Sequence, residues 1–154
     1  MKKTIIFALA FLLIQPALAS DEESVEGLVV TPSHYSVKQT LDRLETILKK
    51  KGITIALRWS HDAKAKSVGI PLRPTELLIF GNPKLGSHMF TSEQTAGIDF
   101  PLKALAWQDE DGKVWLGYND PEYIAERHHI ENRDEVVTKM RGALETFSKY
   151  ATGN

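Results

Sequence analysis

The sequence predicts an α+β domain of two layers, in which an antiparallel sheet of about five strands carries helices on one face. Two stretches with apolar residues at helical spacing, 36–48 and 134–150, bracket a middle region of short, strand-like apolar runs. The connections between these runs are short and contain Pro, Asn, Asp and Gly. Because short connections join antiparallel neighbours, the middle region predicts a meander that the long helices cover from one side.

The predicted order begins with a strand and a helix. Residues 28–35 form the strand, which Pro32 limits to an edge or an end of the sheet. Ser36 and Gln39 have the spacing of a capping box, in which each side chain bonds the backbone N–H of the other residue. Gly52 can take the left-handed conformation that ends such a helix. The apolar stripe of this helix consists of Val37, Leu41, Leu44 and Leu48.

Four further strands are expected at 53–59, 75–81, 102–108 and 114–118. The segment 75–81 is apolar on both faces and should therefore lie inside the sheet. Asp111-Gly112, between the last two strands, is a hairpin turn signal. Trp59, Trp107 and Trp115 are expected in the sheet core, because burying an aromatic ring stabilises the fold more than displaying it.

Helical segments fill the remaining positions. A short helical turn is expected at 62–69. Asn82-Pro83 and Asp120-Pro121 each combine an N-cap residue with Pro at the first helical position, so each predicts the start of a short helix. The last helix should run from about Asp134 to Tyr150.

The first nineteen residues have the pattern of a signal peptide. Lys2 and Lys3 precede an apolar run at 4–14, and Ala17-Leu18-Ala19 supplies the small residues that signal peptidase reads. We expect cleavage between Ala19 and Ser20, export to a bacterial periplasm, and no membrane span afterwards. The remaining chain then comprises a flexible acidic N-terminus at 20–27 and one α+β domain at 28–154.

Composition excludes several function classes. The chain has no cysteine, which rules out disulfides, thiol catalysis and thiolate metal sites. The net charge is −1 and becomes slightly more negative when the signal peptide is removed, so nucleic acid is not an expected partner. No residue pattern points to a cofactor.

Several motifs resemble the family named domain of unknown function 302. The most specific motif is LRPTELLIFGNP at 72–83, and DFPLK at 99–103 and YNDPEY at 118–123 agree with it. His61, Gly86, Met89 and the helix at 36–48 extend the resemblance over about 28–128. The resemblance implies a β-α-β4-α fold similar to that of the TATA-binding protein and a homodimer as found among family members. It implies no biochemical role, because none is established for the family.

Two groups of polar residues are candidate sites when the meander is folded. Antiparallel pairing about Asp111 sets Lys103 opposite Asn119 and brings Asn82 to the same rim of the sheet. Two helix N-termini and a lysine at this rim predict a site for an anionic group of a small ligand, with Tyr118 and Tyr123 as hydroxyl donors.

The opposite rim gathers His61, Arg73, Thr75 and Glu76. These residues support an alternative function, a periplasmic enzyme that uses His61, Arg73 and Glu76 for acid–base chemistry. A third alternative is a copper or zinc binder built from His61, His88, Met89 and His128, although no metal-ligand spacing is present and no metal site is assigned. No catalytic residue is assigned either. The preferred interpretation is an exported domain that binds a small ligand or a protein partner and is not an enzyme.

Overall fold

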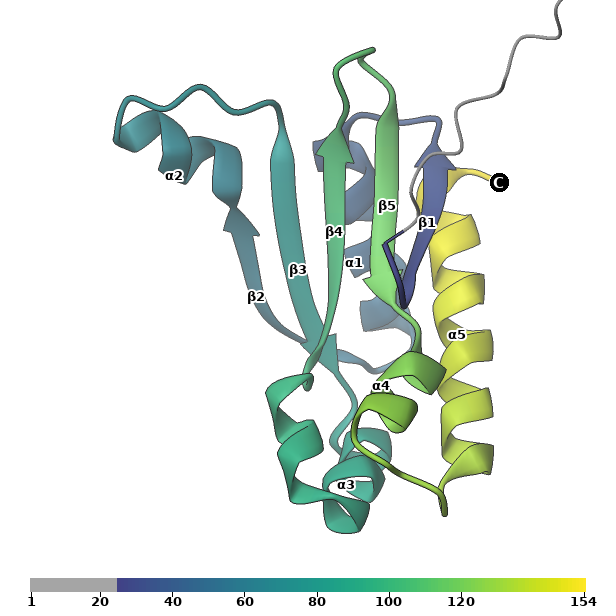
Figure 1. Ribbon diagram of the computed structural model, residues 1–154. Helices are drawn as coiled ribbons and strands as arrows, with labels where there is room; N and C mark the ends of the chain where they lie inside the picture. Colours follow the sequence, from purple (N-terminus) through teal and green to yellow (C-terminus); the bar gives the residue numbers. More distant parts are fainter. Residues whose placement is uncertain (1–24) are drawn as a thin grey trace, which may run out of the picture.

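The structure, a computed structural model, describes residues 25–154; the predicted signal peptide and residues 20–24 lie outside this range. Its centre is a five-stranded antiparallel sheet in the order β1-β5-β4-β3-β2 (Figure 1). The strands are β1 (Leu28–Ser33), β2 (Thr54–Ser60), β3 (Thr75–Gly81), β4 (Leu102–Gln108) and β5 (Val114–Asn119). The α+β class and the antiparallel meander are thereby confirmed. β1, which contains Pro32, is an edge strand as predicted, and β3 lies inside the sheet.

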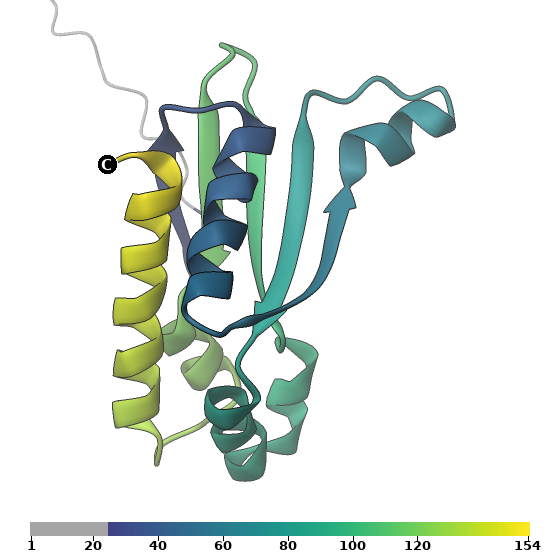
Figure 2. The same ribbon diagram turned by 180° about the vertical axis from the view of Figure 1, so that it is seen from behind.

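Two long helices lie side by side on one face of the sheet, α1 (Val37–Lys50) and α5 (Asp134–Thr152) (Figure 2). Ser36 and Gln39 form the predicted capping box of α1, and Gly52 follows it with a φ of 69°. The stripes of both helices pack on alternate residues of β3, β4 and β5 to form the main core. Its buried members include Leu41, Leu44, Leu48, Leu78, Phe80, Ala104, Ala106, Leu116, Leu144 and Phe147.

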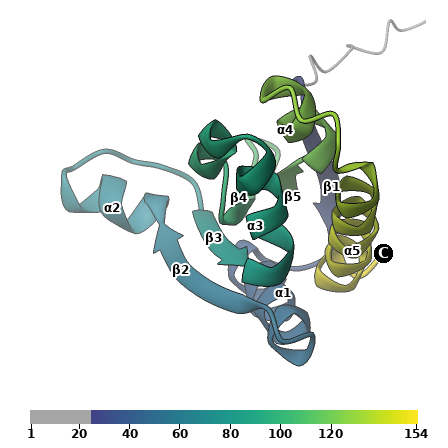
Figure 3. The same ribbon diagram turned by 90° about the horizontal axis from the view of Figure 1, so that it is seen from below.

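Short helices extend the fold beyond both ends of the sheet. α2 (His61–Ser67) follows β2 at one end, whereas α3 (Pro83–Ser92), the 3-10 helix η1 (Gln94–Ile98) and α4 (Pro121–Arg127) cluster at the other (Figures 1 and 3). Asn82 and Asp120 cap α3 and α4 as predicted. The second cluster packs against α5 around Met89, Ala96, Ile130, Val137 and Met140. Among the described residues, no helix is both long enough and apolar enough to cross a membrane.

The face of the sheet opposite α1 and α5 is apolar and open. Leu78 and Phe80 point into the core, so Leu77 and Ile79 point to the other face. The same alternation puts the tryptophans of β2, β4 and β5 on this open face: Trp59, Trp107 and Trp115. Trp59 is 40% exposed, and none of the three belongs to a buried cluster. Our prediction of a core position for them was wrong, because the stability gained by burying an aromatic ring does not specify which face of the sheet the helices cover.

Candidate functional site

The strand pairing brings Asn82, Lys103 and Asn119 to the same end of the sheet, as predicted. Phe80 pairs with Leu102, and Ala104 pairs with Tyr118. The ends of β3 and β5 and the start of β4 therefore lie at one end of the sheet, as the hairpin centred on Asp111 predicts.

The polar side chains of this rim bond the local backbone. Lys103 Nζ donates to the carbonyl oxygens of Asp99 and Pro101, at 3.1 and 3.0 Å. Asn82 Oδ1 accepts from the backbone N–H of Lys84 at 3.0 Å and so caps α3. These bonds fix the loop that enters β4 and the first turn of α3.

The other three rim residues lie apart from Asn82. Tyr118 is 8% exposed, and burial, together with nearby Asp120, raises the pKa of its phenol. The ring of Tyr123 lies directly over Gly27, and Asn119 is exposed at the end of β5. Asn82 lines one cavity and Tyr118 lines a different one. The structure therefore places the predicted residues at one rim without gathering them around one ligand-sized space.

A cavity of about 460 Å³ lies at this end of the sheet. Its walls come from β2, α3, the segment between η1 and β4, and α5. Six of the residues that line it are Thr54, Ala56, Gly86, Phe90, Phe100 and Met140. A bulge between Ile55 and Leu57 interrupts the pairing of β2 with β3 at this point. The sequence pointed to Asn82, which lines the cavity, but did not predict the cavity itself. The bulge beside it could not be predicted, because it contains no Gly or Pro.

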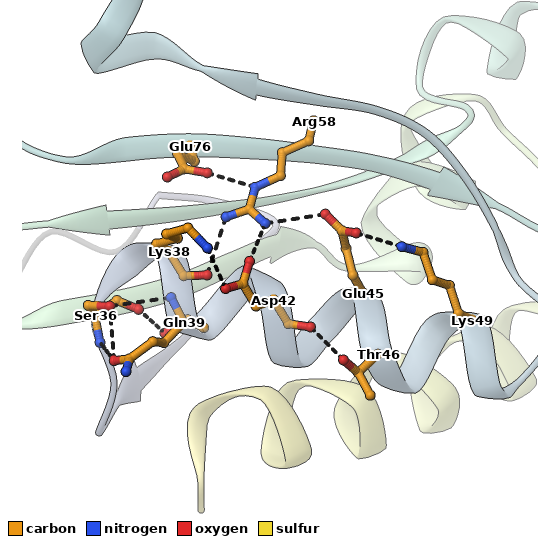
Figure 4. A network of polar contacts seen from close by, with 10 residues as sticks. Ser36, Lys38, Gln39, Asp42, Glu45, Thr46, Lys49, Arg58 and Glu76 are labelled. Atoms are coloured by element: carbon orange, nitrogen blue, oxygen red, sulfur yellow. Dashed lines mark hydrogen bonds and ion pairs between the residues drawn. The ribbon is translucent and has the colours of Figure 1, made fainter.

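The opposite rim is organised by Arg58, which sequence reasoning also missed (Figure 4). Arg58 Nε donates to Glu76 at 2.7 Å, and Nη1 donates to Asp42 at 2.6 Å and to Glu45 at 3.3 Å. Hydrogen bonds from Lys38 and Arg58 hold the pKa of the Asp42 carboxyl below its usual value. Glu76 therefore belongs to an ion-pair network that joins β2 and β3 to α1.

The remaining residues of that rim do not join Glu76. Arg73 Nε donates to the carbonyl oxygen of Gln108 at 3.0 Å, and Thr75 Oγ1 donates to the carbonyl oxygen of Arg73 at 2.9 Å. His61 is exposed at the start of α2. These bonds shape the turn before β3 and give no support to an acid–base pair with Glu76.

A partly buried chain of hydrogen bonds joins the exposed Thr95 to His128 and Asp99. His128 Nε2 lies 2.6 Å from Asp99 Oδ2, and Nδ1 lies 3.1 Å from Thr95 Oγ1. Thr95 Oγ1 also donates to Glu93 Oε1 at 3.1 Å. The chain ties the end of α4 to η1 and to the loop before β4. No sequence spacing could have revealed it, because His128 comes 29 residues after Asp99.

The alternative metal site is not assembled. His61 begins α2 and His88 lies on α3, at opposite ends of the sheet (Figure 1), and Met89 is fully buried. Within residues 25–154, no group of three or more His, Asp or Glu side chains could hold a metal ion.

Comparison with known proteins finds related sequences and a solved structure with a similar fold. Two proteins named "Fluoride-specific ion channel FluC 1", from Brucella suis biovar 1 and Brucella abortus biovar 1, are each 42% identical to this chain over 140 residues, or 90% of it. The matched part covers 54% and 51% of those proteins, so the chain spans about half the length of these curated relatives.

A solved structure has a similar fold. The crystal structure of the uncharacterized conserved protein DUF302 from Bacillus stearothermophilus has a TM-score of 0.74 to this structure at 18% identity. The match covers 82% of this chain and 99% of that chain. The family model for the domain of unknown function DUF302 matches residues 29–147, which include the rim at Asn82 and the cavity walls from β2 to Met140. The chain therefore belongs to the DUF302 family.

Proposed function

We propose that this domain is an exported binding module that engages a protein partner through the open face of its sheet. The partner that fits this face best is a second copy of the chain. The observation that carries the proposal is the uncovered apolar face itself. Export rests on the signal-peptide pattern of residues 1–19.

The open face is apolar across the width of the sheet. Its exposed members include Val30 at 40%, Leu57 at 45% and Trp59 at 40%. Contiguous apolar patches of this kind are rare on monomeric proteins and mark interaction sites. The half-buried apolar residues between them are Leu77, Ile79, Leu105, Trp107 and Trp115.

The size of this face suits a dimer. Five strands spaced about 4.8 Å apart, with lengths near 20 Å, give a face of about 500 Å², or about 1,000 Å² for two copies. The connection between α2 and β3 extends beyond the sheet (Figure 1) and adds Val68, Ile70 and Leu72, which are 70%, 59% and 49% exposed. With this connection the buried area would approach the size of a stable interface.

The chemistry of the face favours a copy of itself over a charged partner. Lys64 and Lys113 lie over the rings of Trp59 and Trp115, at 4.9 and 4.0 Å from the ring centroids. Asp109 accepts a bond from Trp115 Nε1 at 2.6 Å. These charges already contact the tryptophans, so the face presents mainly hydrocarbon, which is complementary to itself about a two-fold axis.

Sedimentation velocity tests this proposal. We expect a dimer at micromolar concentration, and we expect Leu57→Glu to raise the dimer dissociation constant roughly tenfold or more, because each copy would bury an unpaired carboxylate. Ile98→Glu is the matched control, since Ile98 is 72% exposed and lies on η1, beyond the end of the sheet. A wild-type monomer at high micromolar concentration would refute self-association through this face.

The names of the Brucella relatives favour a second candidate function, in which the domain works with a fluoride channel and binds fluoride itself. The anion would contact Lys103 at the rim near Asn82, where it would compete with the carbonyl oxygens of Asp99 and Pro101 for the ammonium group. Fluorine NMR tests this: the protein should broaden the fluoride signal, and Lys103→Ala should remove the broadening. Lys66→Ala is the control, because Lys66 is an exposed lysine of α2, at the other end of the sheet. A fluoride signal unaffected by wild-type protein would exclude the candidate.

A further inference from the structure

We propose that the 460 Å³ cavity between β2, α3 and the start of β4 binds an uncharged aromatic molecule that carries a hydroxyl or carbonyl group. This site is separate from the open sheet face, and its occupation does not depend on the proposed dimer.

The chain forms this cavity at the end of the sheet where the pairing of β2 is irregular. Thr54 still pairs with Gly81, but the bulge between Ile55 and Leu57 disturbs the register. Thr54 and Ala56 then line the cavity on the β2 side, and Gly86, Ser87 and Phe90 line it from α3. Its volume lies within the range of small-ligand sites, about 300–1,000 Å³.

The walls select against a charged ligand. No Lys, Arg, His, Asp or Glu belongs to the residues that line the cavity, all of which lie in the described part of the chain. An ion placed there would lose part of its hydration without gaining an opposite charge, which is unfavourable. The ligand is therefore neutral.

An aromatic group fits the shape of one wall. Phe90 and Phe100 both line the cavity and meet edge to face, with ring centroids 5.5 Å apart and planes at 71°. A third ring can add to such a pair by stacking or by another edge contact. Gly86 lies against both phenylalanines, since a Cβ there would come within 3.4 Å of Phe90 and 3.6 Å of Phe100.

Polar groups are available for one hydrogen-bonding function on the ligand. Asn82 Oδ1 caps α3, which leaves the amide NH2 of Asn82 as a donor. Thr54 and Ser87 also line the cavity and offer hydroxyls that can donate or accept. A hydroxyl or a carbonyl can use these groups, whereas pure hydrocarbon would leave them unused.

Backbone amide NMR with three matched probes tests the ligand class: acetophenone, benzoate and cyclohexyl methyl ketone. Acetophenone should bind saturably and shift the amides of Gly86, Phe90 and Gly97. Benzoate should bind roughly tenfold more weakly or worse, because of its charge. Cyclohexyl methyl ketone keeps the carbonyl but lacks the aromatic ring, so it should bind about threefold to tenfold more weakly.

Two variants fill the cavity. Gly97→Leu adds a side chain where a Cβ meets no atom within 4 Å, and Ser87→Phe adds a ring from the exposed surface of α3. Each should weaken acetophenone binding roughly tenfold or more, because the added side chain occupies the space of the ligand. Gly142→Leu is the control: it makes the same change at an equally open glycine on α5 that does not line this cavity.

Several outcomes would overturn the site. One is the absence of saturable acetophenone binding to wild-type protein. Another is benzoate binding as tightly as acetophenone. A third is a set of shifts confined to the tryptophans of the open face, which would place the probe on the proposed dimer surface. Unchanged binding in both Gly97→Leu and Ser87→Phe would also overturn it.

Discussion

Replacing Arg58 by Met should destabilise the fold by about 2–3 kcal/mol at neutral pH. The change keeps most of the hydrocarbon stem of Arg58 and removes only its charge and donors. Glu45 and Glu76 would lose their shared cation while their side chains are only 19% and 20% exposed. Breaking a fully buried pair costs about 3–5 kcal/mol and an exposed one about 0.2–1 kcal/mol. The 24% exposure of Arg58 places it between these limits.

The same reasoning predicts how the effect depends on pH. Burial raises the pKa of Glu45, but hydrogen bonds from Lys49 and Arg58 outweigh it, so the folded pKa lies below the ordinary 4.5. The folded pKa of Asp42 likewise lies below 3.8. A lowered carboxyl pKa contributes stability above the unfolded pKa and loses it as the pH falls through the folded pKa. The difference between wild type and Arg58→Met should therefore be largest near pH 7 and shrink below about pH 4.

Urea unfolding followed by far-ultraviolet circular dichroism, at one fixed protein concentration, measures both quantities. Lys38→Met is the control, because Lys38 also pairs with Asp42 but is 74% exposed. It should cost at most about 0.5 kcal/mol. A cost below that level for Arg58→Met, or a cost that is the same at pH 7 and pH 3, would refute the assignment of a stabilising ion-pair network to Arg58.

Three further predictions concern the N-terminus, metals and backbone strain. Intact-mass measurement of protein from the periplasm should show Ser20 as the first residue, and a retained Met1 in the membrane fraction would contradict export. Treatment with EDTA should leave the melting temperature nearly unchanged, since residues 25–154 hold no cluster suited to a metal ion; a large drop that zinc or copper reverses would contradict this. Gly27→Ala should cost about 2–4 kcal/mol in thermal unfolding, because a Cβ at its φ of 74° is strained and meets Tyr123. Gly69 has a φ of 79°, and a Cβ there would meet no atom within 4 Å, so Gly69→Ala should cost only the backbone strain, about 1–2 kcal/mol. Equal costs for Gly27→Ala and Gly69→Ala would show that the Tyr123 contact is irrelevant.

Local sequence signals predicted the helices, the strands and the hairpin register of this fold, because these features depend on residues that are neighbours in the sequence. The capping box of Ser36 and Gln39 placed the start of α1, and Asp111-Gly112 fixed the pairing of β4 with β5. The partners of side chains depend on the third dimension instead. We expected Glu76 near His61. Its side chain instead lies on the α1 side of the sheet, where it pairs with Arg58.

The tryptophans show a related limit. The size of their rings predicted core positions for Trp59, Trp107 and Trp115, but all three lie on the open face. Both faces of β3 are apolar, so the sequence offered no means to decide which face the helices cover. A domain of this size that spreads apolar residues over both faces of its sheet, with helices for only one, has more hydrophobic surface than its own core uses.

The division of polar and apolar residues bears on where this domain acts. Three charged groups at the rims already have partners in the fold. Lys103 donates to backbone carbonyls, Glu76 pairs with Arg58, and Asp99 bonds His128. Catalysis by these groups would require breaking bonds that hold the fold together. The open sheet face and the cavity beside the β2 bulge, in contrast, are lined mainly by hydrocarbon. Burial of apolar surface at these two places is the physical basis of the binding functions that we propose.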